Sequence, residues 1–270
     1  MVSVIIIQYN NSQLTETAIE TLLKFHKDNL EVILIDNGST DPNALSFTEQ
    51  YPGLKIIRCE NNLGFGAANN LASKQASGDI LLFLNNDVVI TSDFISNIEI
   101  EFNRNSSIGI IGPKLLNKDN SLQLSCGELP SFVIELRDKI LYAAVDKKNT
   151  LALKYINGKF IHKEEMEWVT GAALFITKKL FEELKGFDES YFMYYEDKDL
   201  CARALEKGKK VLYFLDSNLI HLKGGSFNGP NKKFLMQKYR ESQVLYYQKH
   251  KSKFQQTLLH AYLKLSGKLN

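Results

Sequence analysis

Short apolar runs alternate with longer segments of helical periodicity in the first third of the chain. Four runs are suited to buried strands, at residues 2–7, 32–35, 54–58 and 80–84. Between the first two runs, apolar residues from Leu14 to Phe25 recur at helical spacing, and Ser12 is the expected helix cap. This order predicts an α/β fold with a mostly parallel central sheet and helices on both faces.

The remaining segments differ in how clearly they are patterned. Residues 64–77 predict a helix that ends at Gly78, and residues 172–177 predict a strand. Further helices are expected at residues 178–184, stopped by Gly186, and at residues 197–207, stopped by Gly208. Residues 114–167 carry dense charge without a clear period, so we expect a loop-rich excursion that faces an acceptor.

The last forty residues are distinct in charge. Residues 231–270 contain nine Lys or Arg and one acid, whereas the whole chain has a formal net charge of +2, so residues 1–230 are acidic. Apolar residues recur at helical intervals among these lysines, which predicts a basic amphipathic helical tail after a domain of residues 1–230. We expect the tail to pack on that domain. Its alternatives are a homodimer contact and peripheral contact with an anionic membrane.

Composition narrows the class of protein only a little. An apolar fraction of 44% and a charged fraction of 24% are ordinary for a globular chain of 270 residues. Cys59, Cys126 and Cys201 are an odd number without metal-ligand spacing, which favours reduced thiols in the cytoplasm. The first apolar run has no basic leader, so we interpret it as a strand rather than a signal peptide. No apolar stretch reaches the roughly 20 residues of a membrane-spanning helix.

Polar residues follow three of the predicted strands directly. They are Gln8–Asn10, Asp36–Ser39 and Asn85–Asp87. In open α/β sheets, ligands bind outside the carboxyl ends of the strands. The three segments therefore predict one ligand-binding crevice.

Three carboxylates occur within four positions, at Glu196, Asp197 and Asp199. Carboxylates at this spacing repel one another, so they usually face water or serve a proton, a metal or a hydroxyl-rich ligand. Their alternative role is an acidic first helical turn, which the helix dipole favours. We assign that alternative chiefly to Asp199, whose side chain should point around the helix from Asp197.

These segments together resemble family 2 glycosyltransferases of the GT-A fold, and especially their rhamnosyltransferase-like bacterial branch. The resemblance covers most of residues 1–230 and depends on the order of seven motifs. They are residues 2–10 (VSVIIIQYN), 35–41 (IDNGSTD), 61–66 (NNLGFG), 84–87 (LNND), 186–189 (GFDE), 196–200 (EDKDL) and His221. Each motif is weak alone, but their joint order and spacing make coincidence improbable.

The resemblance implies a nucleotide-sugar donor. Asp36 and the end of the first strand would hold the base and ribose, and Gly64 would let the backbone approach the diphosphate at a helix start. The expected donor-binding residues are Gln8, Tyr9, Asn10, Asp36, Asn61, Gly64, Asn69, Asn85, Asn86 and Gly171. For Asp36 an Asx turn is the structural alternative, and for Gly64 it is simple helix entry.

The resemblance also implies a divalent metal, Mn²⁺ or Mg²⁺. Asp87 occupies the acidic metal motif, in which two of three residues are amides here, and His221 would be the second ligand. One carboxylate can suffice, because these ions keep waters and bind substrate phosphates. Lys223 could assist the leaving diphosphate. A histidine between two apolar residues is otherwise often a structural one.

For the transfer itself, the family assigns the general base to the Glu-Asp pair. We choose Asp197 as the base, with Glu196 positioning the base or the acceptor. A single attack opposite the leaving group would invert the anomeric centre. Trp168, the single tryptophan, would stack on the acceptor sugar, and core packing is its alternative.

The sequence therefore predicts that residues 1–230 form the catalytic domain of an inverting, metal-dependent glycosyltransferase. It would transfer a sugar from dTDP-rhamnose or a UDP-sugar to a glycan or lipid-linked acceptor in bacterial surface polysaccharide synthesis, without a nucleic-acid partner. A cytoplasmic enzyme is expected, with peripheral contact at the inner face of the cell membrane. Two alternatives are an NAD-dependent oxidoreductase, because Gly64–Asn69 resembles half of a dinucleotide fingerprint, and an inactive nucleotide-sugar-binding module.

Overall fold

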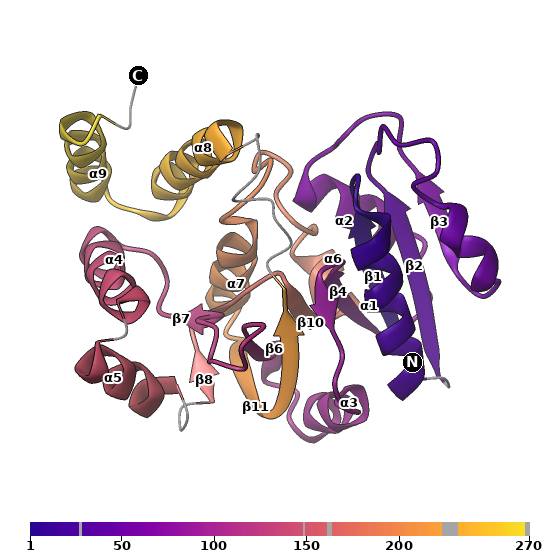
Figure 1. The fold of residues 1–270 in the computed structure, drawn as a ribbon. Coiled ribbons are helices and arrows are strands. Elements are labelled where there is room, and N and C mark those ends of the chain that lie inside the picture. Colours follow the sequence, from indigo (N-terminus) through magenta and orange to yellow (C-terminus); the bar gives the residue numbers. More distant parts are fainter. Residues whose placement is uncertain (27–28, 148, 161–163, 223–231, 268–270) are drawn as a thin grey trace.

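The computed structural model describes residues 1–26, 29–147, 149–160, 164–222 and 232–267. Nine strands of these residues form the main sheet (Figure 1). Its order is β3 (Lys55–Arg58), β2 (Leu30–Asp36), β1 (Val2–Gln8), β4 (Ile80–Asn85), β10 (Ala173–Thr177), β6 (Ile108–Leu116), β11 (Lys210–His221) and β5 (Val88–Val89), with β8 (Glu165–Met166) paired to β11. The short strands β7 (Cys126–Gly127) and β9 (Trp168–Val169) pair separately.

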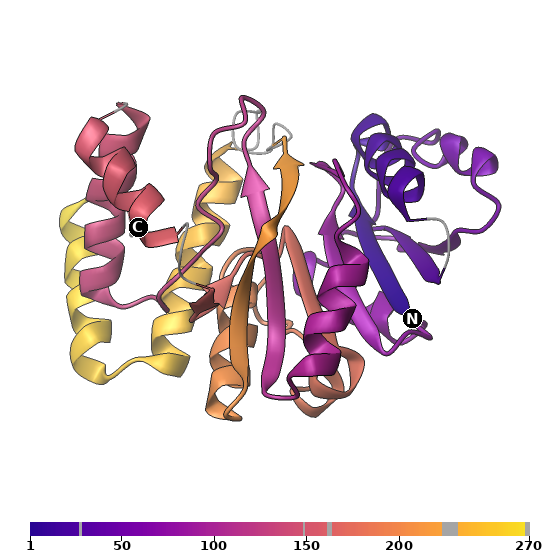
Figure 2. The ribbon, with the colours of Figure 1, turned by 90° about the horizontal axis from the view of Figure 1, so that it is seen from below.

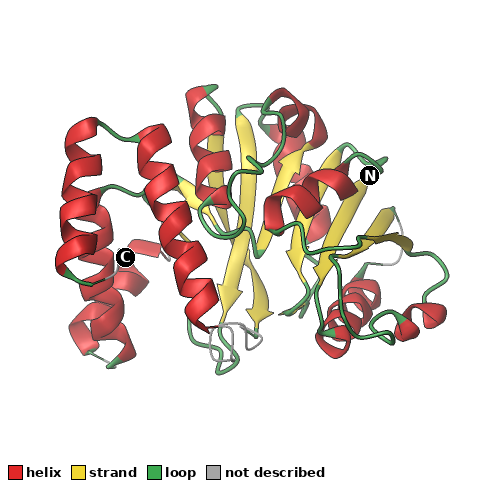
Figure 3. Ribbon diagram, turned by 90° about the horizontal axis from the view of Figure 1, so that it is seen from above, coloured by secondary structure: helices red, strands yellow, loops and turns green. Residues whose placement is uncertain are grey.

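Helices cover both faces of the sheet (Figure 3). They are α1 (Ser12–Phe25), α2 (Phe65–Ser73), α3 (Ile95–Arg104), α4 (Phe132–Asp146), α5 (Thr150–Phe160), α6 (Lys178–Glu183), α7 (Glu196–Glu206), α8 (Lys232–His250) and α9 (Lys253–Leu265), with a 3₁₀ turn at Ser46–Gln50. Strand β1 shows how the layers form, because Val4 and Ile6 face one core and Ile5 faces the other. The predicted α/β class is confirmed.

The carboxyl ends of β1, β2 and β4 lie level at one edge of the sheet. These strands and β3 are mutually parallel, and the register pairs Gln8 with Asp36 and Ile7 with Asn85. Beyond β4 the sheet is mixed, because β10 runs antiparallel to both β4 and β6. The polar segments that follow the three strands therefore begin side by side, as their positions in the sequence predicted.

The prediction of a loop-rich excursion at residues 114–167 is wrong. The segment contains helices α4 and α5, and Ser131 caps α4 by accepting a hydrogen bond from the Ile134 amide. Helix α4 carries apolar residues around much of its circumference, so it has no single apolar stripe whose period could be recognised.

Two predicted helix boundaries also need correction. The N-cap of α1 is Asn11, and Ser12 is already helical. Helix α2 ends at Ser73, before the predicted stop at Gly78. Gly78 instead lies against the first strand, where an added Cβ would be 2.7 Å from the Met1 carbonyl oxygen. The glycine stops of the later helices are confirmed, since Gly186 and Gly208 both have a φ of +73°.

The helical tail packs on the rest of the chain. Tyr246, Tyr247, Leu259 and Leu263 of α8 and α9 are buried in a cluster with Tyr195 and its neighbours. Together with α4 and α5, these helices lie at the end of the sheet opposite β3 (Figures 1 and 2). The apolar side of the tail is thus used for packing, which was the expected role.

Asp199 ties the tail to helix α7. It is 1% exposed, and its carboxylate accepts a hydrogen bond of 2.7 Å from Arg203 Nε and lies 2.7 Å from His250 Nε2 of α8. Asp199 therefore has a structural role, in agreement with the alternative reading of the third acid in the cluster.

Candidate active site

The loop after β2 is built around two buried side chains, Asp36 and Asn37. Asp36 Oδ1 accepts a hydrogen bond of 3.2 Å from the Ser39 amide, which is the Asx turn considered above. Asn37 Oδ1 accepts one of 2.9 Å from the Leu63 amide, and Asn37 Nδ2 donates one of 3.2 Å to the Gly64 carbonyl. Asn37 thereby fixes the loop before α2 against the end of β2, a role that our list of site residues missed.

Gly64 is held by close backbone contact. Its φ is +84°, and an added Cβ would be 2.4 Å from the Phe192 carbonyl oxygen. That oxygen accepts a hydrogen bond of 2.9 Å from the Phe65 amide, so the first turn of α2 is anchored to the segment before α7. Only glycine fits such an approach without displacing the backbone.

Two other residues predicted to bind the donor lie beside this turn. Asn61 is exposed at the rim of the loop. Asn69 is 1% exposed and donates a hydrogen bond of 3.1 Å to the Phe65 carbonyl, within its own helix. In this arrangement the Asn69 amide supports the turn rather than facing open space.

The end of β1 divides its three residues between packing and exposure. Gln8 is fully buried and donates a hydrogen bond of 2.6 Å to the Ala44 carbonyl. Tyr9 is 43% exposed. Asn10 Oδ1 accepts a hydrogen bond of 2.7 Å from the Thr40 amide, which joins the loops after β1 and β2. Tyr9 and Asn10 are therefore the exposed members of this group, and the Asn10 side chain is held by the loop after β2.

The two asparagines at the end of β4 form hydrogen bonds with neighbouring elements. The Asn85 amide N–H donates a hydrogen bond of 2.9 Å to the Ala172 carbonyl, which links β4 to the turn that contains Gly171. Asn86 Nδ2 donates one of 2.9 Å to Thr15 Oγ1 on α1. This leaves Asp87 as the acidic group at the end of the segment.

Asp87 and His221 meet, as predicted. His221 Nε2 is 3.0 Å from Asp87 Oδ1, and His221 Nδ1 is 2.9 Å from Gln123 Nε2. The contact depends on strand pairing, because β11 extends to His221 and pairs that residue with Val88 of β5. His221 is thus the last residue of β11 (Lys210–His221). Lys223 lies outside the described residues.

The Asp87–His221 pair fits two positions of a divalent metal site. Adjacent ligand atoms of an octahedral ion with bonds of about 2.1 Å are about 3.0 Å apart, close to the observed separation. The described residues contain no cluster of three or more His, Cys, Asp or Glu suited to a metal. Substrate phosphates and water would have to supply the other ligands.

The two acids at the start of α7 have opposite environments. Asp197 is partly exposed, and its oxygens accept hydrogen bonds of 2.8 Å from the Lys198 amide and 3.0 Å from the Gly171 amide. Glu196 is 6% exposed, and its Oε2 has no hydrogen-bond partner. Burial, followed by the negative charge of Asp197, raises the pKa of Glu196 to about 8. At neutral pH, Glu196 is therefore largely protonated beside an oriented carboxylate.

Backbone contacts connect most of the predicted site. The Gly171 amide donates a hydrogen bond to the Asp197 carboxylate, and the neighbouring Ala172 carbonyl accepts one from the Asn85 amide. Gly171 also lies against Phe65, because an added Cβ would be 3.2 Å from that ring. Asp36 is joined to the same turn of α2 through Asn37. Asp87 and His221 form a pair two residues beyond Asn85. That all four charged groups surround one donor-sized hollow remains a prediction.

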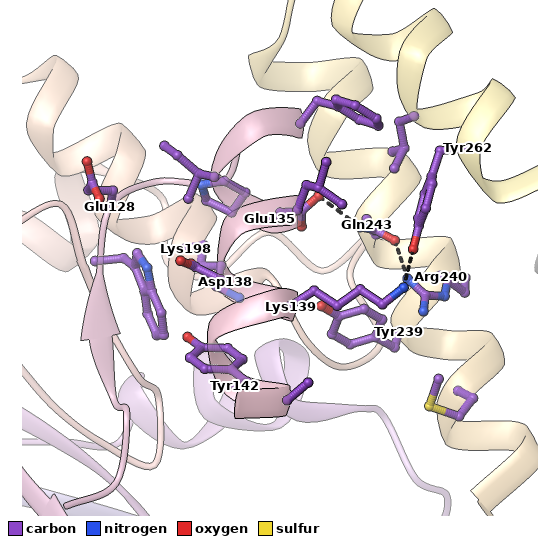
Figure 4. Close-up of a pocket in the computed structure, with 18 residues that line it drawn as sticks. Glu128, Glu135, Asp138, Lys139, Tyr142, Lys198, Tyr239, Arg240, Gln243 and Tyr262 are labelled. Atoms are coloured by element: carbon purple, nitrogen blue, oxygen red, sulfur yellow. Dashed lines mark hydrogen bonds between the residues drawn. The ribbon is translucent and has the colours of Figure 1, made fainter. Parts of the chain in front are cut away.

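A cavity of about 470 Å³ lies beside the first turn of α7, where Lys198 lines it (Figure 4). It is bounded by α4, α8, α9 and β9, and its wall includes the neighbour of the predicted base, Lys198, and the predicted acceptor contact, Trp168. The Lys198 ammonium lies 4.7 Å from the Trp168 ring centre and 4.5 Å from that of Tyr195. Such cation–π contacts fix the position of both side chains.

Glu135 of α4 organises the wall of this cavity. Its carboxylate accepts hydrogen bonds from the Tyr195 hydroxyl, from Tyr247 at 2.7 Å and from Gln243 Nε2 at 2.9 Å. These partners come from α8 and from the residue before α7, so the network holds three helices together. Glu135 was not among the predicted site residues, because the segment that contains α4 was predicted to be loop-rich.

Solved structures define the class of this fold. The structure is similar to S. aureus TarS 1-349 in complex with UDP, with a TM-score of 0.60, 17% identity and coverage of 92% of this chain and 72% of that chain. It is also similar to GalNAc-T7 with UDP, GalNAc and Mn²⁺, with a TM-score of 0.63, 17% identity and coverage of 90% and 48%. The chain thus has the GT-A fold of glycosyltransferases, as predicted.

Sequence relatives identify the family. An N-acetylglucosaminyl-diphospho-decaprenol L-rhamnosyltransferase of Mycobacterium tuberculosis is 27% identical over 73% of this chain and 68% of its own length. The rhamnosyltransferase WbbL of Escherichia coli is 24% identical over 82% and 83%. The family model described as Glycosyl transferase family 2 matches residues 3–149, just over half of the chain. The chain belongs to glycosyl transferase family 2.

Proposed function

We propose that this family 2 glycosyltransferase is an inverting enzyme that moves a sugar, with rhamnose as the first candidate, from a nucleotide-diphosphate donor to a lipid-linked acceptor in bacterial surface polysaccharide synthesis. The rhamnosyltransferase relatives support the sugar, and the diphospho-decaprenol acceptor named for one of them supports the lipid-linked acceptor. UDP in two structural neighbours supports a nucleotide donor. Family membership gives no support to the NAD-dependent alternative.

The observation that carries the mechanism is the fixed carboxylate of Asp197. Two backbone N–H groups hold it, and the acceptor-side cavity begins at the next residue. The acceptor hydroxyl gives its proton to Asp197 while its oxygen bonds to the anomeric carbon. The bond between that carbon and the phosphate oxygen breaks, and its electron pair leaves with the nucleoside diphosphate. Attack opposite the leaving group inverts the centre.

Glu196 supports this step in its protonated form. Because its pKa is raised to about 8, it can donate a hydrogen bond near neutral pH, and a second full negative charge beside Asp197 is avoided. A protonated neighbour leaves the proton-accepting role to Asp197. Glu196 is therefore a positioning residue in this proposal, and Asp197 is the base.

On the donor side, Asp36 and Tyr9 would contact the base and ribose, and the N–H groups at the start of α2 would face the diphosphate. Asp87 and His221 would hold Mn²⁺ or Mg²⁺, which when bound supplies positive charge beside the leaving diphosphate. Their separation of 3.0 Å, and the Mn²⁺ present in one structural neighbour, support this assignment.

On the acceptor side, Trp168 and the cavity beside it would hold the acceptor sugar. Aromatic rings, carboxylates and an amide surround this space, which is the usual mixture for binding sugar faces and hydroxyls. In this proposal the acceptor reaches Asp197 from the side of α4 and α8, and the donor reaches it from the ends of β1, β2 and β4.

The test is Asp197→Asn, with release of nucleoside diphosphate and transfer to a lipid-linked acceptor measured at saturating substrates. We expect kcat to fall by about 10²–10⁴, the usual contribution of a general base. The matched control is Asp216→Asn, an exposed aspartate on β11, which should retain full rate. Near-normal transfer by Asp197→Asn would refute the assignment. Tight donor binding without any turnover by the wild type would instead indicate the inactive binding module.

A further inference from the structure

Helices α4 and α5 expose an unusual amount of apolar surface. Val133 is 74% exposed, Ile140 is 65% exposed and Leu151 is 78% exposed. Further exposed apolar residues of these two helices are Leu136, Tyr142, Leu153 and Tyr155. Val133, Leu136 and Ile140 share one side of α4 by helical spacing, as Leu151 and Tyr155 share one side of α5, and we call the surface formed by these five residues the α4–α5 surface. Contiguous exposed apolar patches on soluble proteins usually mark an interaction site.

The α4–α5 surface lies opposite the side of α4 that packs inside the protein. The inner side carries Glu135 and lines the 470 Å³ cavity (Figure 4). The outer side forms a shallow apolar groove that includes Val133, Leu136 and Ile140. Leu136 lines both spaces, so the groove is continuous with the wall of the cavity. Figures 1 and 2 show α4 and α5 at the outer end of the molecule, away from the sheet.

The exposed charges around this surface have one sign. Among the described side chains of residues 131–155, the exposed charged ones that do not face the cavity are Lys147 and Lys154, since Lys139 donates a hydrogen bond of 2.7 Å to the Tyr262 hydroxyl inside it. The two acids of this segment whose side chains are described are engaged, since Asp138 pairs with Arg137 at 2.7 Å and Glu135 accepts the hydrogen bonds described above. Apolar side chains flanked by lysines are the composition of helices that lie in the interface of an anionic bilayer.

We propose that the α4–α5 surface binds the surface of an anionic lipid bilayer, with its apolar side chains inserted at the level of the headgroups. Leu, Ile, Val and Tyr would supply buried apolar area, and the lysines would face the anionic headgroups. That this contact serves to receive a lipid-linked acceptor rests on the proposed function, whereas the membrane binding itself does not.

Charge favours a bilayer over a second copy of this chain. In a two-fold dimer the same patch faces itself, which would bring the lysines of both copies to one interface, and the described side chains of residues 131–155 include no exposed acid to balance them. Most of the large apolar side chains of the tail are packed on the body and are therefore not free to enter a bilayer. Phe254 and Leu265 of α9 remain exposed, at 72% and 90%, and they provide a matched control.

The test is binding of the full chain to vesicles of phosphatidylcholine with phosphatidylglycerol, measured by flotation. We expect Val133→Glu/Ile140→Glu to weaken binding by at least about tenfold, because two apolar insertions become charged. Phe254→Glu/Leu265→Glu should bind like the wild type. Binding of the wild type should also fall when phosphatidylglycerol is left out or the salt is raised.

Activity separates this proposal from the proposed function. Val133→Glu/Ile140→Glu should transfer sugar to a short-chain, water-soluble acceptor at the wild-type rate and lose rate only with acceptor embedded in vesicles. Unchanged vesicle binding by this variant, or absence of wild-type binding, would overturn the membrane proposal whatever the transferase does. A wild-type dimer that becomes monomeric in this variant would overturn it in favour of a second copy.

Discussion

The donor side and the acceptor side of Asp197 are built in different ways. On the donor side, the predicted residues directly follow β1, β2 and β4, and short-range backbone hydrogen bonds such as that from the Ser39 amide to Asp36 fix the loops. On the acceptor side, Glu135, Tyr195 and Tyr247 come from segments far apart in the chain. The donor side therefore depends on the sheet, and the acceptor side depends on the docking of helices.

This difference has a consequence for how the two sides respond to damage. A substitution that loosens the tail should open the acceptor side and leave the parallel strands intact. A substitution at the end of β4 should impair donor chemistry without altering the helices. Acceptor binding and donor binding should accordingly be separable by mutation.

The largest expected effect is a loss of stability where the tail helices dock on the acceptor side. Asp199→Ala removes the buried carboxylate shared by Arg203 and His250 and leaves the Arg203 charge without its partner. Loss of one member of a buried pair costs about 3–5 kcal/mol of unfolding free energy. Denaturant unfolding should show this loss, and limited proteolysis should cleave α8 first. Asp216→Ala is the exposed control, and equal stability of the two variants would contradict the role of Asp199.

The next effect is confined to the donor side. Asp87→Ala should lower the transfer rate by about 10²–10³, because the negative leaving group loses its metal-bound stabilisation. His221→Ala should act on the same ion, so the double variant should cost less than the product of the two single effects. Transfer rates of the variants measured over a range of Mn²⁺ concentrations test whether the two residues act on one ion. Independent, multiplicative losses would argue against a shared metal.

Glu196→Gln tests whether Glu196, which lies between the two sides, is protonated in the folded protein. The folded pKa of about 8 is above the usual 4.5, so the stability that Glu196 contributes is fully present below about pH 4.5 and is lost as the pH rises through about 8. The glutamine stays neutral, so the variant should gain roughly 4 kcal/mol relative to the wild type between about pH 5 and pH 9, at about 1.4 kcal/mol for each unit of difference in pKa. Denaturant unfolding at both pH values measures the gain. A difference independent of pH would show that Glu196 is ionised throughout.

The smallest effect sharpens the acceptor side. Trp168→Ala should raise the KM for the acceptor by about tenfold while the KM for the donor stays unchanged, because the ring forms part of the cavity wall only. Trp168→Phe keeps an aromatic face and should recover most of the loss. A matching rise in the donor KM would indicate that Trp168 instead supports the turn at Gly171.

The sequence predicted that the ends of β1, β2 and β4 meet, because the signals for this are local. A buried strand followed by polar residues is visible in a short window, and parallel register then brings such ends together, as Gln8 and Asp36 show. The Asp87–His221 contact followed from the family resemblance. Its physical cause, the extension of β11 to pair with β5, involves residues more than a hundred positions apart, which no local pattern reveals.

The acceptor side was mostly invisible in the sequence for the opposite reason. Helix α4 has apolar residues on the side of the cavity and also on the side of the solvent, so its sequence shows no clear helical period of apolar residues. Its Ser131 cap could have been recognised. Glu135 and Lys198 acquire their roles only when α8 docks beside them. Trp168 was found because a single indole is conspicuous, and its setting needed the structure.

The position of Trp168 also gives the protein a built-in optical reporter. As the chain has one tryptophan, all of its indole emission arises from the wall of the cavity beside Lys198. A sugar or lipid headgroup entering that space would change the polarity around the ring and displace the ammonium that now lies over it. Under the proposed function, fluorescence of the unlabelled wild-type enzyme should therefore report acceptor binding separately from nucleotide binding at the strand ends.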